Sequence, residues 1–212
     1  MADIFDTRFK DKEIELSNNR AVVGDDVNLT AKDETLKKIL IGAGWDINAF
    51  DADALDLDIS VLLLNKDNTT REDQEFVFYN NTEAYGGAVT HNGDSRTGAG
   101  DGDDESISVD LQGVPFDVVK FLLVISIYKG VEKGQTMDMV RNAYIRIVNA
   151  ENNIELVRYE LTDVLNDKTE SAMIAAAVNR EGPKWHFVPM AEFVEGGLAE
   201  VATRHGMIIA QQ

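Results

Sequence analysis

Phe121-Leu-Leu-Val-Ile-Ser-Ile-Tyr128 is an almost wholly apolar run of eight residues. Such a run is typical of a β-strand that is buried on both faces. Residues 107–111, 143–148 and 155–161 alternate instead between apolar and polar side chains, which indicates strands with one buried face. The last two flank a turn at residues 149–153 and form a predicted hairpin. Many short strands at close spacing predict a mostly β fold, a two-sheet β-sandwich with a few short helices.

Two segments have the composition of helices. Residues 197–205 carry basic side chains in the last turn and are followed by Gly206, which predicts a helix that ends there. Residues 169–178 include three consecutive alanines. Because alanine leads the helix-propensity scale, composition alone predicts a helix in this second segment as well.

The most unusual segment is 93–105, Gly-Asp-Ser-Arg-Thr-Gly-Ala-Gly-Asp-Gly-Asp-Asp-Glu, which holds five carboxylates and four glycines against one base. Like charges this close repel, and a glycine-rich backbone has a large conformational entropy to lose on ordering. Calcium reverses that balance, because it takes oxygen ligands from carboxylates, carbonyls and water. The segment therefore predicts a calcium loop, and a solvated acidic loop is the alternative that composition leaves open.

Two familiar motifs do not fit this segment. An EF-hand requires glycine at its sixth position and glutamate at its twelfth, where this chain has Ser106 and Gln112. The glycine spacing also differs from a dinucleotide fingerprint, and the flanking acids would repel phosphate. His91, which leads into the segment, is expected to be a bystander because calcium prefers oxygen.

Further oxygen-bearing residues lie at predicted strand ends. If residues 56–64 form a strand, Asp56 and Asp58 point to the same face with Cα atoms about 6.5–7 Å apart, which suits one cation or two adjacent ones. An edge whose charges discourage pairing is the alternative. Asn80 offers an amide oxygen or forms a turn, and Asp46 lies where the chain turns.

Composition narrows the classes of function. The chain has 212 residues and a net charge of −18, from 38 acids and 20 bases, so we expect no binding to nucleic acid. It has no cysteine, which removes thiol chemistry and leaves oxygen ligands and three histidines for any metal. No apolar run reaches the ~20 residues of a membrane span, and residues 1–12 are charged where a secretory signal would be apolar. We therefore expect a cytoplasmic protein.

Taken together and in order, five segments resemble the TerD family of tellurium-resistance and general-stress proteins. They are Gly42-Ala-Gly-Trp-Asp46, Asp56-Leu-Asp58, Phe76-Val-Phe-Tyr-Asn-Asn81, the acidic segment 93–105, and Arg141-Asn-Ala-Tyr-Ile-Arg-Ile-Val-Asn149. The similarity extends over residues 21–209. It implies a calcium-binding sandwich domain at residues 21–212 after an N-terminal extension of residues 1–20, and a strand instead of a helix at residues 169–178.

The resemblance also implies a set of calcium ligands drawn from these segments. They are Asp46, Asp56, Asp58, Asn80, Asp94, Gly98, Gly100, Asp101, Asp103, Asp104 and Glu105, the two glycines through their carbonyls. Three features depart from the family pattern: the extension, Lys129 where an acidic residue is customary, and the small residues 175–178. A weakened site or a different partner surface is the expected consequence.

The leading functional hypothesis is a non-enzymatic, calcium-binding stress protein that acts in tellurite and chemical-stress resistance. Calcium would order the acidic loops and create a surface that protein partners read. The resemblance implies protein partners within a stress-resistance complex. The inner face of the membrane is one location that it suggests for this complex. Two alternatives are a metal-dependent hydrolase that uses the carboxylate cluster, and calcium-mediated recognition of a membrane or sugar.

Overall fold

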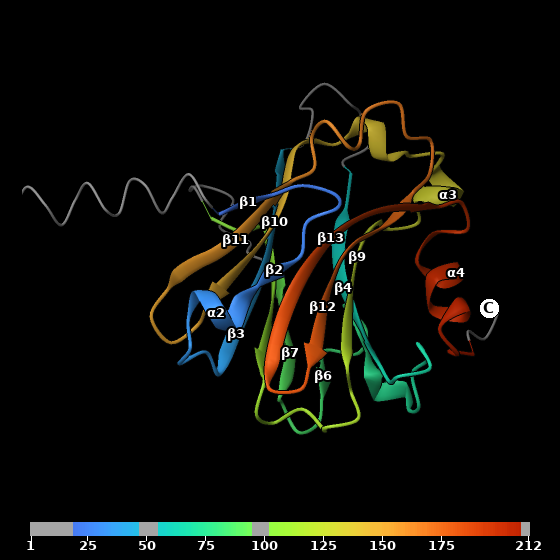
Figure 1. Ribbon diagram of the computed structural model, residues 1–212. Helices are drawn as coiled ribbons and strands as arrows, with labels where there is room; N and C mark the ends of the chain where they lie inside the picture. Colours follow the sequence, from blue (N-terminus) through green and yellow to red (C-terminus); the bar gives the residue numbers. More distant parts are fainter. Residues whose placement is uncertain (1–18, 47–54, 95–101, 209–212) are drawn as a thin grey trace, which may run out of the picture.

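The computed structural model describes residues 19–46, 55–94 and 102–208, which form two β-sheets with a hydrophobic core between them (Figure 1). The seven strands of sheet A are, in spatial order, β1 (Arg20–Ala21), β11 (Ile154–Glu160), β10 (Arg141–Asn149), β3 (Lys38–Asp46), β8 (Glu105–Asp110), β7 (Val89–Asp94) and β6 (Glu83–Ala84). The six strands of sheet B are β2 (Val27–Asn28), β13 (Lys184–Val194), β12 (Ala172–Glu181), β9 (Lys120–Ile127), β4 (Leu57–Leu64) and β5 (Phe76–Val77). The predicted two-sheet sandwich is confirmed.

Helices are short and lie outside the sheets. In the described residues they are α2 (Leu29–Lys32), α3 (Gly130–Lys133), α4 (Gly197–Arg204) and the 3₁₀ helices η1 (Asp73–Glu75) and η2 (Met137–Met139). α4 is the helix predicted at residues 197–205, and its last turn carries Arg204 as expected. None of the helices in these ranges has the length and apolar character to cross a membrane.

The centre of sheet B is apolar on both faces because each face packs against a different layer. On β4, Leu57, Ile59, Val61 and Leu63 face the core that the two sheets share. Leu62 and Leu64 face the other way and join a second cluster with Val201 and Ala202 of α4, which covers the outer face of sheet B (Figure 1). The all-apolar run on β9 follows from the same arrangement, since Leu122 and Val124 belong to the second cluster.

The alanine-rich segment is a strand, so the helix predicted from propensity is wrong and the strand implied by the family resemblance is correct. β12 pairs with β9 on one side and β13 on the other, so its backbone hydrogen bonds are met by neighbours in the sheet. Ala172 and Ala177 lie beneath α4 in the outer cluster, where small side chains leave room for the helix. Tertiary packing here overrides local propensity.

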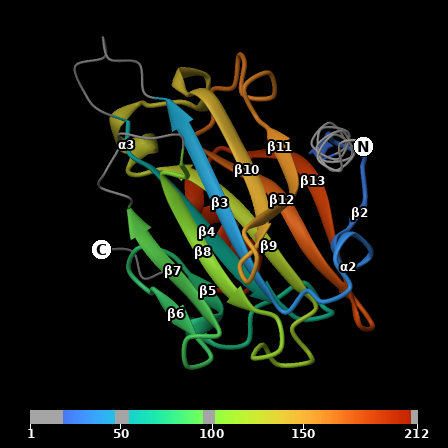
Figure 2. The ribbon, with the colours of Figure 1, turned by 90° about the vertical axis from the view of Figure 1, so that its left-hand side faces the viewer.

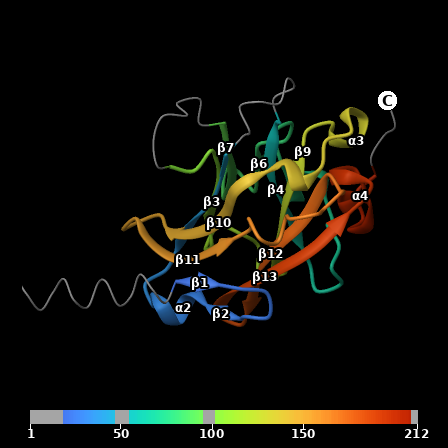
Figure 3. The same cartoon turned by 90° about the horizontal axis from the view of Figure 1, so that it is seen from above.

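The start of the described chain closes one side of the sandwich. β1 pairs in parallel with β11 at the edge of sheet A, and β2 then pairs with β13 at the edge of sheet B (Figure 3). The Tyr159 hydroxyl of β11 also donates to the Met190 carbonyl of β13, at 2.9 Å. Two sheet edges that would otherwise face solvent are therefore tied to each other along this side.

Candidate metal centre at the acidic end of the sandwich

The predicted ligand segments meet at one end of the molecule. β3 ends at Asp46, and its antiparallel neighbour β8 begins there with Glu105, which stands opposite Ala43. Asp94 at the end of β7 is also opposite Glu105, and Figure 2 shows these strand ends side by side. We define the acidic end by the described positions of the predicted acidic ligands, Asp46, Asp56, Asp58, Asp94, Asp103, Asp104 and Glu105.

Asp103 is held by a bidentate ion pair. Arg146 Nε donates to its Oδ1 at 2.8 Å and Arg146 Nη2 donates to its Oδ2 at 3.0 Å. The Tyr144 hydroxyl donates to Oδ1 at 3.0 Å. Burial, followed by the charge of Asp103 and this hydrogen bond, raises the pKa of Tyr144 to about 12, so Tyr144 stays a donor at neutral pH.

Asp104 is fastened to β3 through the backbone. Its carboxylate accepts a hydrogen bond from the Trp45 amide at 2.7 Å, and its own amide donates to the Ala43 carbonyl at 2.8 Å. Asp104 thus extends the pairing of β8 with β3 to the residue before Glu105, the first residue of β8. Asp104 and Glu105, at the end of the acidic segment, are therefore fastened to sheet A.

Glu105 and His91 form hydrogen bonds with the backbone of β4 at Ile59, which no strand pairs with on that side in the part of the chain that the structure describes. β5 covers only Val61 and Leu62 of β4, so Ile59 lies beyond the reach of β5. Glu105 Oε2 accepts from the Ile59 amide at 2.6 Å, and His91 Nε2 contacts the Ile59 carbonyl oxygen at 3.1 Å. Both side chains are buried and cross from sheet A to sheet B, so they join the two sheets beneath the acidic end.

The protonation of His91 follows from its two neighbours. Its Nδ1 accepts a hydrogen bond from the Gly93 amide at 3.1 Å, which places the proton on Nε2, where it is donated to the Ile59 carbonyl. The adjacent Glu105 raises the pKa of His91, and burial acts in the opposite direction. His91, expected to be a packed or exposed bystander, is packed between the two sheets.

Three of the other predicted ligands, Asp56, Asp58 and Asn80, lie on the sheet B side of the acidic end. Asp58, in β4, is buried and Asp56, just before it, is exposed. Burial raises the pKa of Tyr79, and so do Tyr128 and the charges of both aspartates. Tyr79 therefore lies within electrostatic reach of this pair, and the exposed Asn80 directly follows it in the chain.

The donor chemistry suits calcium, although the described residues alone form no cage. Asp46 is exposed and accepts a hydrogen bond from Asn142 Nδ2 at 2.6 Å. Across residues 19–46, 55–94 and 102–208, no three acidic or histidine side chains lie close enough to hold a metal ion. Gly98, Gly100 and Asp101 lie outside these ranges, as does the side chain of Asp94. Every predicted ligand offers oxygen, which is the donor that a hard cation prefers.

Sequence reasoning missed three residues of this end, Arg146, Tyr144 and His91 in its joining role. The alternation along residues 143–148 fits the half-buried, outward position of Arg146 in β10. Nothing in the pattern linked it to Asp103, which is 43 positions away. The one available signal was Gly42, the β3 residue paired with Arg146, whose lack of a side chain leaves space on that face.

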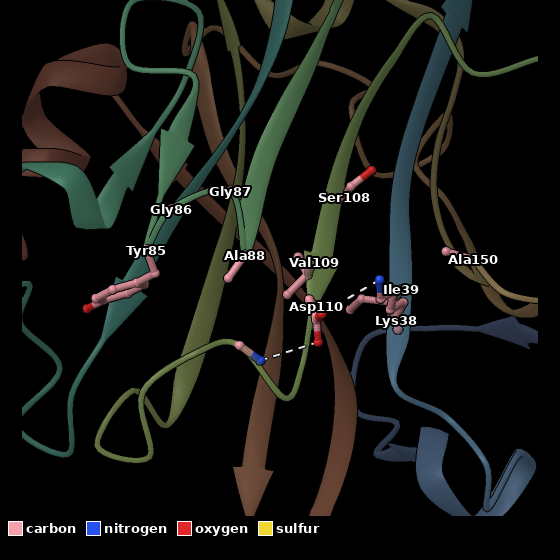
Figure 4. A pocket seen from close by; sticks show the side chains of 11 residues that line it. Lys38, Ile39, Tyr85, Gly86, Gly87, Ala88, Ser108, Val109, Asp110 and Ala150 are labelled. Atoms are coloured by element: carbon pink, nitrogen blue, oxygen red, sulfur yellow. Dashed lines mark hydrogen bonds and ion pairs between the residues drawn. The ribbon is translucent and has the colours of Figure 1, made fainter.

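A second candidate site lies at the opposite end of sheet A. A cavity of about 410 Å³ is bordered by the start of β3, the end of β8 and the turn before β7, including Lys38, Gly87, Ser108 and Asp110 (Figure 4). Lys38 Nζ pairs with Asp110 Oδ2 at 3.7 Å, and Asp110 Oδ1 accepts from the Gln112 amide at 3.0 Å. The charged groups of the cavity are therefore balanced locally, which favours a turn anchor over a reactive site.

One buried cluster has the residue types of a catalytic site but the geometry of a structural one. Glu75 is fully buried and accepts hydrogen bonds from Arg71 Nε, at 3.0 Å, and from the Tyr85 hydroxyl. Arg71 also pairs with Asp117. The cluster fastens η1 to the turn before β7 and to the loop between β8 and β9, and full burial keeps Glu75 from substrate.

Comparisons with known proteins agree with this architecture. A family model described as the TerD domain matches residues 21–205. Tellurium resistance protein TerD of Serratia marcescens is 39% identical over 184 residues, 87% of this chain and 95% of that protein. General stress protein 16U of Bacillus subtilis is 40% identical over 185 residues, again 87% of this chain and 95% of that protein.

The fold is also shared with a solved structure. The crystal structure of a homologue of telluride resistance protein (TerD) from Streptomyces coelicolor A3(2) has a TM-score of 0.63 to this chain at 20% identity. The match covers 79% of this chain and 95% of that one. With a family model matched across both sheets and relatives near 40% identity over the same span, this chain belongs to the TerD family.

Proposed function

We propose that the chain is a calcium-binding stress-response protein, which acts in resistance to tellurium compounds and other stresses by docking protein partners and not by catalysis. Its relatives named above are a tellurium resistance protein and a general stress protein. The observation that supports the calcium part is that the ends of β3, β4, β7 and β8 that carry Asp46, Asp58, Asp94 and Glu105 lie at the same end of the sandwich.

We assign the ion chiefly to predicted acids other than Asp103, Asp104 and Glu105. Asp103, Asp104 and Glu105 accept hydrogen bonds within the fold. Asp56 and Asp58 approach the acidic end from sheet B, and the acidic segment adds Asp94 and Asp101 from its first part. A cation held between these two groups would connect the rims of both sheets, and the amide oxygen of Asn80 and the carbonyls of Gly98 and Gly100 complete the proposed donor set.

The mechanism is a change of surface charge. At −18 the chain repels itself and any acidic partner. Each bound calcium ion removes two negative charges from one end of the sandwich and favours one arrangement of the segments that hold it. A partner that recognises this arrangement binds only when calcium is present.

A calcium titration with a matched melting experiment tests the proposal. At calcium about 100-fold above the dissociation constant, the folded state gains about 2.7 kcal/mol, which raises the melting temperature by roughly 5–11 °C for a chain of this size. Asp58→Asn should reduce this gain. Asp67→Asn, an exposed acid in the turn after β4 at the other end, removes the same charge and should leave the gain intact.

Two outcomes would contradict the calcium proposal. One is an equal melting temperature in calcium and in EGTA, together with no heat of binding in calorimetry. The other is an equal loss of the calcium response in Asp58→Asn and Asp67→Asn, because a general charge effect would then explain the response without a site. A response to magnesium equal to that of calcium would revise the identity of the ion.

A further inference from the structure

Asp103 lies in the densest part of the acidic segment, yet its carboxylate is already neutralised by the protein. Arg146 grips both of its oxygens, and Tyr144 donates to one of them. The Asp103 side chain is only 8% exposed, whereas the guanidinium side chain of Arg146 is 24% exposed. A bidentate carboxylate–guanidinium pair leaves few lone pairs for a cation and places a positive charge beside any ion that would bind there.

Two glycines of β3 leave the space in which this ion pair lies. A Cβ on Gly42 would lie 2.1 Å from Oδ2 of Asp103, so only glycine lets the carboxylate rest on the strand. A Cβ on Gly44 would lie 2.5 Å from the Tyr144 ring, two residues along the same face. The alternating glycines of β3 therefore make room for Asp103 and for the tyrosine that donates to it.

Arg146 is also fixed from the side away from Asp103. Its Nη1 donates to Glu155 Oε2 on β11 at 3.2 Å, and Glu155 in turn pairs with Arg158 at 3.3 Å. The Arg158 guanidinium lies 3.8 Å from the centre of the Tyr144 ring. Sheet A thus holds the guanidinium of Arg146 in place through contacts that do not involve Asp103.

We propose that Asp103 is a positioning residue and not a calcium ligand: the clamp of Arg146, Tyr144 and Gly42 fixes residues 103–105, the end of the acidic segment that the structure describes, on sheet A in the arrangement that favours ion binding at the acidic end. This inference rests on the calcium site of the proposed function. The internal cation Arg146 takes the place of calcium at Asp103, and the ion is left to other oxygens of the acidic end. Binding then loses less entropy, because the end of the segment next to β8 is already ordered.

The test is calcium calorimetry on the full chain with variants that break the clamp in different ways. Asp103→Asn removes the carboxylate charge, Arg146→Met removes the guanidinium, and Gly42→Ala displaces the carboxylate without changing any charge. Each should weaken calcium binding by about 10-fold or more, the range typical of groups that orient metal ligands. The double variant Asp103→Asn with Arg146→Met should bind no more weakly than either single variant, because both break one unit.

Two further variants make the test specific. Arg20→Met removes a cation from the same outward row, two strands from Arg146, and should leave calcium binding unchanged. Arg146→Lys keeps the positive charge but cannot grip both oxygens, so it should show part of the loss. Arg146→Lys also replaces Arg146→Met in the test if the latter does not fold. Thermal unfolding in EGTA shows for every variant whether the fold persists.

The outcomes separate this inference from the proposed function. If Asp103 is a ligand, Asp103→Asn abolishes binding while Arg146→Met and Arg146→Lys bind calcium as tightly as the parent or more tightly, which overturns the inference. Additive losses in the double variant also overturn it. Failure of the parent to bind calcium overturns the proposed function and the inference with it, and that result is visible in the parent alone.

Discussion

Replacing Glu105 with alanine is expected to destabilise the protein even when no calcium is present. Glu105 Oε2 accepts the Ile59 amide hydrogen at 2.6 Å, and Ile59 is fully buried. Since β5 does not reach this part of β4, alanine leaves the amide of Ile59 without that acceptor. The same substitution also removes a charged neighbour of His91, whose Nε2 is 3.7 Å from Glu105 Oε2.

The size of the effect follows from the hydrogen bond that is lost. Leaving a buried donor without an acceptor costs about 1–3 kcal/mol, and a bond to a charged acceptor lies towards the upper part of that range. For a chain of this length, a loss of about 2–3 kcal/mol corresponds to a fall in melting temperature of roughly 4–12 °C. A purely metal-binding role for Glu105 predicts no such loss in the absence of calcium.

Thermal and urea unfolding in EGTA measure this difference directly. Asp46→Ala is the matched control, because it removes one carboxylate from the same end where the side chain is exposed, and it should change stability by no more than about 0.5 kcal/mol. Hydrogen exchange adds a local readout, since the Ile59 amide should exchange faster in Glu105→Ala. If Glu105→Ala melts in EGTA at the temperature of the Asp46→Ala control, Glu105 does not complete β4 and the reasoning is wrong.

Two other substitutions test contacts away from the acidic end. Hydrogen bonds from Thr35 and Asn149 lower the pKa of Asp33 to about 2, so its stabilisation is complete above its unfolded pKa of ~3.9 and is lost as the pH falls towards 2. Asp33→Ala should cost about 1 kcal/mol at pH 7, and urea midpoints of parent and variant should converge between about pH 4 and 2; a constant gap would contradict this sign. Tyr159→Phe removes the hydroxyl that donates to the Met190 carbonyl across the two sheet edges, and should lower stability by about 1–2 kcal/mol in urea unfolding, whereas an unchanged midpoint would show that this bond is replaced by water.

Much of the fold follows from local patterns that the sequence displays openly. The apolar run of β9, the alternation of β10 and β11 around their turn, and the basic last turn of α4 each match the element observed. The exception is β12, whose alanines favour a helix in isolation. Its strand conformation depends on pairing with β9 and β13 and on the approach of α4, and a local pattern contains none of these.

The candidate site also has features that the sequence predicts and others that only the structure shows. The calcium loop at residues 93–105 is predicted from charge and glycine content, which can be read without coordinates, and the loop and its ligand set stay predictions. Which counter-ion each acid has depends on the packing of the sheets. Arg146 reaches Asp103 across Gly42 from 43 positions away, and Glu105 meets Ile59 from 46 positions away. Such pairings arise only when the strands are aligned, because a side chain's partner is set by strand register and not by its neighbours in the chain.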